Sequence, residues 1–188
     1  MRMSHDDDPT LLRRVAEGDR GAFETLYRRF YPRVSGYVFR VCRRSELVEE
    51  VVGDVMLTLW RSAARFDGRS RVSTWVFGIA YRKTLKALDR HRRRHESLDE
   101  APEPATEGGA EARVARRELR GSLLAAMALL SADQRAVVDL AYFQDLSCAE
   151  IAAAVGCPVN TVKTRLFHAR RRLRELLPEL GIAGAEAI

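Results

Sequence analysis

The sequence predicts an all-α protein of two small helical domains joined by an acidic flexible linker. Apolar residues recur at the three- and four-residue spacing of amphipathic helices, and no stretch alternates apolar and polar residues as a half-buried strand would. Helix-capping residues precede several of these periodic stretches. Residues 95–112 are rich in Glu, Pro, Ala and Gly and have no apolar period, which is typical of a linker.

Two helices are expected at the start of the chain. Asp8 followed by Pro9 predicts an N-cap with proline at the first helical position, opening a short helix over 10–17. Asp19 is expected to cap a longer helical region whose aromatic stripe packs in the core. Pro32 is predicted to break or kink that region, because proline has no amide hydrogen and clashes with the preceding turn.

Two more helices follow in the same half of the chain. Ser45 is expected to cap a helix over 46–61, and Ser73 to start one that runs to about residue 94. On the later helix, Trp75 is predicted to face inward and Tyr81 to lie on a more polar side. The expected organisation is a first domain over 9–94, the linker over 95–112 and a second domain over 113–180.

The second domain is expected to begin with a helix over 113–130, after which a capping box opens the next helix. It ends in two helices with a sharp turn between them, residues 146–177. Ser147 and Glu150 form an S-x-x-E capping box on the first of these, and Gly156 suits the left-handed position just past its end. This is the layout of a helix-turn-helix, whose second helix enters the major groove of duplex DNA.

The second helix of this motif carries basic residues on the face away from its apolar stripe. Such a face can be simply solvated, but the capping box, glycine turn and polar first turn together favour DNA binding. Asn160 is expected to be its N-cap, and Arg165 is the candidate for a base-edge contact, because arginine pairs bidentately with guanine. The candidate duplex-contacting residues are Asn160, Thr161, Lys163, Thr164, Arg165 and Arg170.

The charge of the chain also favours an anionic partner. The formal net charge is +6, and seven of the residues 82–94 are Lys or Arg, whereas 95–112 contain six acids and no Lys or Arg. A basic helix beside a polar, glycine-containing loop can follow a phosphate backbone and stack unpaired bases. The candidate single-strand site consists of Arg69, Ser70, Arg71, Trp75, Arg82, Lys83 and Lys86, although Trp75 alone is equally explained by core packing.

Other function classes find little support. Cys42, Cys148 and Cys157 form no C-x-x-C pair, so neither a metal site nor a disulfide is expected, and no cofactor is implied. No catalytic constellation or phosphate-binding loop appears, so the chain is not expected to be an enzyme. No run is long and apolar enough to span a membrane, and the acidic N-terminus lacks a signal-peptide pattern, so a soluble cytoplasmic protein is expected.

The helix over 46–61 has a second face of interest. Glu46, Glu50, Asp54 and Leu57 recur on it at spacings of three and four. This acidic stripe with one apolar residue is equally compatible with an ordinary solvated face and with docking on a basic protein surface.

The run LSCAEIAAAVGCPVNTVKTRLFHARRRLRE resembles region four of bacterial RNA polymerase sigma factors. Upstream, VVGDVMLTLWRSAARFDGRSRVSTWVFGIAYRKTLKALDRHRRR resembles region two. With only these two regions over this length, the chain is similar to the extracytoplasmic-function group of the sigma-70 family. In its region two, Leu47 stands where the family has the first acid of a DAED run, which corresponds here to residues 47–50, and Arg82 and Lys86 replace a common Asn and Asp.

The resemblance implies an alternative sigma factor that binds core RNA polymerase, recognises promoter DNA and promotes strand opening. It implies that region four reads the minus-thirty-five element as duplex and that region two holds the minus-ten non-template strand. The polymerase clamp would then contact Glu46, Glu49, Glu50, Asp54 and Leu57. The family commonly has a regulator, for which an anti-sigma factor and a kinase acting at Thr58 or Ser62 are both candidates.

Two other functions are compatible with parts of the pattern. A helix-turn-helix regulator could bind duplex DNA without polymerase, although the region-two helices and the acidic linker argue against it. An interaction module, such as a decoy for an anti-sigma factor, would lack promoter-dependent activity altogether.

Overall fold

The computed structural model describes residues 7–95 and 124–179 of the chain. The regular elements in these two ranges are all helical, as expected from the sequence. They are α1 (Asp8–Ala16), α2 (Arg20–Cys42), the 3₁₀ turn η1 (Ser45–Leu47), α3 (Val48–Ser62), the 3₁₀ turn η2 (Ala63–Arg65), α4 (Val72–His95), the helical residues 124–128, α6 (Ala132–Tyr142), α7 (Cys148–Val155) and α8 (Val159–Glu179).

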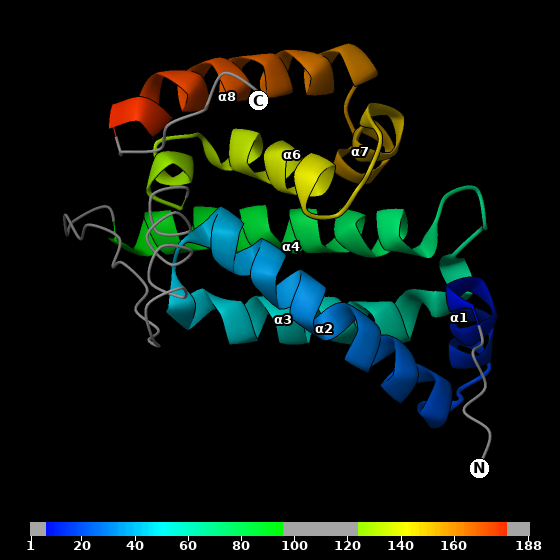
Figure 1. Cartoon of the computed structure of the whole chain (residues 1–188). Helices are drawn as coiled ribbons and strands as arrows, with labels where there is room; N and C mark the ends of the chain where they lie inside the picture. Colours follow the sequence, from blue (N-terminus) through cyan, green and yellow to red (C-terminus); the bar gives the residue numbers. More distant parts are fainter. Residues whose placement is uncertain (1–6, 96–123, 180–188) are drawn as a thin grey trace, which may run out of the picture.

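The helices are stacked in layers (Figure 1). Helices α2, α3 and α4 pack against one another, and α1 packs across α2 at one end. Helices α6 and α7 lie between α4 and α8, so that the second half of the chain rests on the first through α2·α6 and α4·α7 contacts. Both halves therefore belong to one packed body, an arrangement that the linker-like composition of 95–112 did not predict.

The N-cap of the first helix lies one residue earlier than expected. Asp7, rather than Asp8, is its N-cap and accepts a hydrogen bond from the Thr10 amide at 3.0 Å. Pro9 is consequently the second helical residue. The amides of the first helical residues have no partner within the helix, so a proline at this position costs no intrahelical hydrogen bond. The cap at Asp19 is as expected, because its carboxylate accepts bonds from the first amides of α2.

Of the two effects predicted for Pro32, a break or a kink, the break is wrong, since α2 runs without interruption from Arg20 to Cys42. Pro32 lies on the exposed side of the helix, where the carbonyl that loses its partner can bond to water. Buried residues on both sides of it, among them Phe30, Val34 and Tyr37, hold the helix against the core. Tertiary packing thus outweighs the local cost of proline.

Two expectations for the middle of the chain are also corrected. Ser45 does not cap α3: it opens the 3₁₀ turn η1, and α3 starts at Val48 without a side-chain cap. Tyr81 is not on a polar side of α4 but buried, at 8% exposure. Its side chain faces the second half of the chain. Helix α4 is therefore covered by α6 and α7 as well as by the other helices of the first half.

In the second half, the helix expected over 113–130 and the linker lie mostly outside the described residues. Residues 124–128 are helical, and the capping box of Ser131 and Gln134 at the start of α6 is formed. Asn160 is not the N-cap of α8, because α8 begins at Val159 and the amides of Thr161 and Val162 bond to the Pro158 carbonyl.

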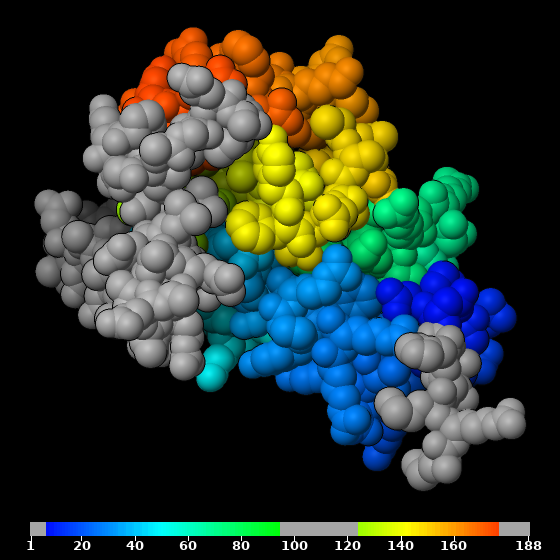
Figure 2. Space-filling view, in the orientation of Figure 1, coloured from blue at the N-terminus to red at the C-terminus, as the bar shows by residue number. Residues whose placement is uncertain are grey.

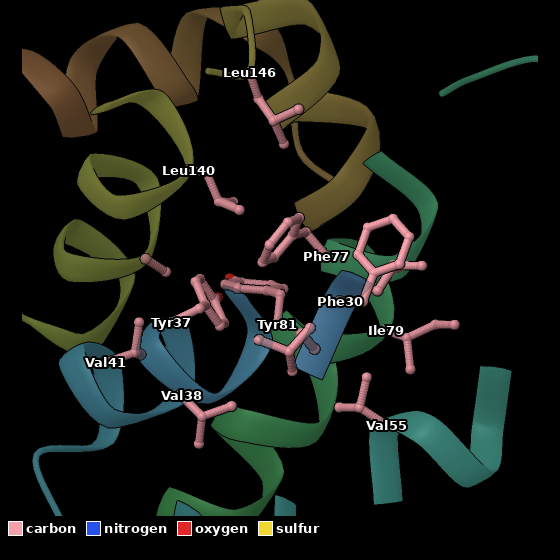
Figure 3. Close-up of a cluster of buried hydrophobic side chains, with 14 of the residues drawn as sticks. Phe30, Tyr37, Val38, Val41, Val55, Phe77, Ile79, Tyr81, Leu140 and Leu146 are labelled. Carbon is pink, nitrogen blue, oxygen red and sulfur yellow. The ribbon is translucent and has the colours of Figure 1, made fainter. Parts of the chain in front are cut away.

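A single apolar core connects the two halves (Figure 3). Tyr37 and Val41 of α2 and Phe77 of α4 lie beside Leu140 of α6 and Leu146. The rings of Tyr37 and Phe77 meet edge to face, with centroids 5.6 Å apart. Burial of this surface is the main force that holds the halves together.

Candidate nucleic-acid and polymerase interfaces

The helix-turn-helix is built from α7, a tight turn and α8. At the start of α7 the Ser147 hydroxyl accepts the Glu150 amide at 3.3 Å, and the Glu150 carboxylate accepts the Ser147 amide at 2.9 Å. The carboxylate accepts hydrogen bonds from the Ser147 amide and then the Ser147 hydroxyl, and these keep the pKa of Glu150 below its usual value. Gly156 ends α7 with φ of 74°, a left-handed conformation that favours glycine.

The outer face of α8 is open to solvent over its first turns. Asn160, Lys163 and Thr164 are exposed, Thr161 is half-buried, and Val162 and Leu166 on the opposite side are buried in the core. Because Asn160 does not cap α8, its side chain can face a DNA groove instead of the start of its own helix. The geometry of a recognition helix is present, with polar and cationic groups projecting from one side.

Two of the candidate arginines on α8 already make contacts within the chain. Arg170 is exposed, and its Nε donates to the Tyr142 hydroxyl at 2.7 Å. Arg165 is only 26% exposed in its side chain, and its Nη2 lies 2.9 Å from the Asp133 carboxylate. Asp133 also accepts the Tyr81 hydroxyl at 2.7 Å. The candidate for base readout therefore points toward α4 and α6 instead of the open face.

Tyr81 is affected by this contact. Burial, followed by the hydrogen bond to Asp133, raises the pKa of Tyr81 above its ordinary value. The hydroxyl is therefore held as a neutral donor between the two halves of the chain.

The candidate single-strand residues fall into two groups rather than one pocket. Arg69, Ser70, Arg71 and Trp75 lie at the N-terminal end of α4 and in the loop before it, while Arg82, Lys83 and Lys86 lie further along α4. From Arg71 to Lys86 the separation is about 22 Å at 1.5 Å per helical residue. A single strand of several nucleotides could contact both groups, but one flipped base could not.

The first group is partly committed to protein contacts. Trp75 is half-buried and packs on Phe66, with ring centroids 5.5 Å apart, which supports its core role. Arg69 pairs with Asp67 at 3.3 Å and remains largely exposed. Arg71 is 70% exposed, yet its Nε lies 3.1 Å from the Glu150 carboxylate at the start of α7.

The acidic stripe on α3 is present and is matched by basic residues of α4. Glu50 pairs with Arg90, and Asp54 accepts from Lys83 at 3.2 Å. Glu46 lies near Arg44 and His91, and its own backbone amide, then Arg44, hold its pKa below the usual value. Glu49 and Leu57 are exposed. Because these ion pairs are exposed, each contributes little stability and can exchange for another cation.

Four residues at the junction of the halves were missed by sequence reasoning. Asp139 of α6 is fully buried and pairs with Arg40 of α2, and Gln144 donates to Asp139 at 3.1 Å. Arg33 of α2 in turn donates to Gln144 at 3.1 Å. The signal available was the acid at position 139 within the run Val137-Val138-Asp139-Leu140, since a carboxylate in an apolar helix face needs a partner.

Among the described residues no cluster of His, Cys, Asp or Glu could hold a metal ion, and no helix is both long and apolar enough to cross a membrane. The three cysteines are free thiols. Arrangements typical of catalysis are not apparent beside the charged surfaces described above.

Comparison with known proteins defines the class to which these surfaces belong. Residues 26–94 match the family model of sigma-70 region 2, and residues 120–173 match that of sigma-70 region 4. The chain is 35% identical over 158 residues to the ECF RNA polymerase sigma factor RpoE of Cereibacter sphaeroides, which is 84% of this chain and 87% of that protein. It is 33% identical over 184 residues to the ECF RNA polymerase sigma factor SigK of Mycobacterium tuberculosis, or 94% and 96% of the two chains.

Solved structures give the same result. CnrH, in complex with the cytosolic domain of CnrY, is matched with a TM-score of 0.69 over 93% of this chain and 99% of that one, at 25% identity. RpoE of Bartonella quintana, in complex with the anti-sigma factor NepR, is matched with a TM-score of 0.66 over 83% and 96%, at 25% identity.

The protein is thus a transcription initiation factor of the sigma-70 type. More narrowly, the chain belongs to the ECF family of RNA polymerase sigma factors. It is an alternative sigma factor that acts with RNA polymerase on promoter DNA. Matches to both sigma regions therefore argue against the alternative function, a helix-turn-helix regulator that binds duplex DNA without polymerase.

Proposed function

We propose that three surfaces of this sigma factor each bind a different partner. The outer face of α8 reads the upstream promoter element as duplex, the basic side of α4 with the loop before it holds the downstream single strand, and the acidic stripe of α3 docks on the polymerase clamp. The observation that supports it best is the face of α8, where polar and cationic side chains stand open above a buried apolar stripe. The protein then acts in the cytoplasm, where polymerase and chromosome are, with no enzymatic activity of its own.

Transcription in a reconstituted system tests the function. Core RNA polymerase is incubated with genomic DNA, with and without the protein, and the 5′ ends of the new RNA are sequenced to find the promoters that require it. A set of start sites that share two upstream elements is the expected result. Start sites that do not depend on the protein would contradict the assignment of all three surfaces.

The role of α4 is tested on one of those promoters. Arg82→Ala and Lys86→Ala should slow strand opening on duplex DNA and do less harm on a template that is already unpaired at the downstream element, because contacts to the separated strand compensate for unpairing. Arg28→Ala is the control, because Arg28 is an exposed residue of α2 that forms an ion pair with Glu24 of the same helix. If the unpaired template rescues nothing, the single-strand site lies elsewhere.

A regulator is also part of the proposal. CnrH and the Bartonella RpoE were solved with CnrY and with an anti-sigma factor, and a protein of that kind is the first candidate here. A kinase is the second, because phosphate on α3 would add negative charge to the docking stripe. Thr58 and Ser62 currently donate to the carbonyls of Asp54 and Thr58 at 2.7 and 2.5 Å.

Polymerase affinity separates the two regulators. Thr58→Glu should tighten binding to core polymerase if phosphorylation is required, with Thr58→Gln as the neutral control of similar size. Tight binding by the unmodified protein, with no gain from the glutamate, would leave a protein regulator as the remaining candidate.

A further inference from the structure

Gly53 lies in the interior of α3, on the side of the helix that is open to solvent. Apart from proline, glycine is the least favourable residue in a helix interior, because it leaves the unfolded chain more conformational freedom than any other residue. The usual backbone reasons for a glycine do not apply here, since Gly53 is helical and lies well away from either end of α3.

The free protein has room for a side chain at this position. Among the described residues, a Cβ added at Gly53 would meet no side chain, and no backbone beyond its own helical turns, within 4 Å. Alanine would therefore fit without a clash and would favour the helix. Because packing within the described chain gives no reason for the glycine, its position points to a partner that approaches this surface closely.

The missing side chain leaves a notch in the surface of α3, bordered by Glu49, Glu50 and Leu57. At 3.6 residues per turn, the two glutamates lie one turn before Gly53 and the leucine lies one turn after it. Helical side chains tilt toward the N-terminus of their helix, so Leu57 is directed toward the empty position. All three bordering residues are exposed, which leaves the notch open to a partner.

One side of the notch is apolar and held in place. Leu57 is 45% exposed, and Trp60 lies two turns beyond Gly53 on the same side of the helix. The Trp60 ring meets Phe23 of α2 edge to face, with ring centroids 5.0 Å apart. This contact fixes the indole before any partner arrives, so that little conformational entropy is lost on binding.

The other side of the notch is acidic and partly uncompensated. No cation in the described ranges pairs with Glu49, whereas Glu50 pairs with Arg90 and Asp54 pairs with Lys83. Those two pairs are at the surface, so a cation from a partner can replace either of them. An arginine or lysine fits both sides of the notch, because its methylene stem lies along apolar surface while its charged head reaches an acid.

We propose that the notch at Gly53 receives an arginine or lysine side chain from a helix of core RNA polymerase. The stem of that side chain lies over Gly53 against Leu57, and its head group binds Glu49. Because two helices approach only as closely as the side chains between them allow, the glycine lets the partner helix come nearer to α3 than any other residue would. The inference rests on the docking of α3 proposed above and adds to it the residue that determines the fit.

A partner can occupy this surface without covering the recognition helix. Helix α3 packs against α2 and α4, on the side of α4 away from α6 and α8 (Figure 1). Figure 2 shows the surfaces of α2 and α8 at opposite ends of the molecule. Docking at Gly53 and reading of duplex DNA by α8 therefore use separate faces of the protein.

Gly53→Ala should change stability and binding in opposite directions. It should raise the melting temperature by about 2–4 °C, because alanine favours the helix and meets no clash. It should weaken the affinity for core polymerase on the order of tenfold, because the added methyl group lies where the partner's side chain has to pass. Thr25→Ala is the matched control: it makes a similar helix-favouring change on α2, where the Thr25 hydroxyl is exposed, and should leave the affinity unchanged.

Glu49→Gln tests the charged side of the notch. This change removes the charge and keeps the shape, so it should weaken polymerase binding by a similar factor. The double variant Gly53→Ala/Glu49→Gln should lose much less affinity than the product of the two single losses, because both changes act on the same side chain of the partner.

Fluorescence anisotropy gives the affinity of each variant for core RNA polymerase, and thermal unfolding followed by circular dichroism gives its melting temperature. A Gly53→Ala protein that is stabilised and binds polymerase as tightly as the wild type overturns the notch. A destabilised one overturns it too, since the glycine would then serve the fold itself. Losses that multiply fully in the double variant overturn the basic side chain as the occupant. A wild-type protein that does not bind polymerase at all refutes the proposed function instead, so the failures are distinguishable.

Discussion

Arg165 has to leave one partner to reach another. Its guanidinium is held by Asp133 of α6, whereas its place near the start of α8 suits a bidentate contact to guanine. Binding of Arg165 to guanine therefore replaces an ion pair within the protein, rather than contacts with water, and its net free energy is the difference between the two interactions.

At this scale we expect Arg165→Ala to weaken binding of the polymerase-bound protein to its best promoter by about 1–3 kcal/mol and to relax the preference at one base pair. Affinity is measured on a panel of duplexes that each change one position of the upstream element. Lys163→Ala is the comparison, and it should weaken all sequences alike and reduce the salt dependence, as loss of a phosphate contact does. Equal weakening of every duplex by Arg165→Ala would make it a phosphate contact too.

Cys42 gives a prediction about pH. Burial raises the pKa of this thiol to about 12, against 9.0 for the unperturbed group. Below pH 9 the thiol is neutral whether the chain is folded or not, so its contribution to stability is complete. Between pH 9 and about 12 only the unfolded chain loses the proton, and stability falls by about 1.4 kcal/mol per pH unit from this group.

Urea unfolding of the wild type and of Cys42→Ala at several pH values between 8 and 11 measures this effect. The free energy of unfolding of the wild type should fall more steeply with pH than that of the variant. Parallel curves would show that Cys42 is reached by water in the folded state.

At the scale of the helix, local chemistry determined which predictions succeeded. The caps at Asp19, Ser131 and Ser147 were predicted correctly, because capping depends on residues within one turn. The break at Pro32 was predicted wrongly, because it depends on packing partners far along the chain. The open face of α8 could be located from the sequence, but the engagement of Arg165 could not, since Asp133 and Tyr81 come from two other helices.

The acidic stripe of α3 gives a prediction for a whole element. Glu50→Lys and Asp54→Lys should each weaken binding to core polymerase by reversing charge on the docking face, and should leave binding of duplex DNA by α8 unchanged. Glu24→Lys, an exposed acid of α2, is the matched charge reversal. Surface plasmon resonance against core polymerase and anisotropy against a duplex make the comparison, and equal losses for all three variants would point to net charge alone.

The whole molecule should unfold as one unit. The apolar core continues from α2 and α4 into α6 and α7, so the two halves share buried side chains. Calorimetry should therefore show one transition, with a calorimetric enthalpy equal to the van't Hoff enthalpy. Two resolved transitions would mean that each half folds on its own and that the junction contributes little. Sequence patterns could not reveal this coupling, because the contacts join helices that are about 100 residues apart.

The shared core also bears on how long each molecule survives in a cell. When the halves separate, apolar residues such as Phe77, Leu140 and Leu146 lose the neighbours that shield them from water. Chaperones and proteases recognise such surface, so a molecule whose halves have come apart is exposed to degradation. We expect a variant that weakens the contact between the halves, such as Arg40→Ala, which leaves the buried Asp139 without its partner, to have a shorter half-life in vivo than the wild type. Packing between the halves would then govern the abundance of this sigma factor as well as its stability.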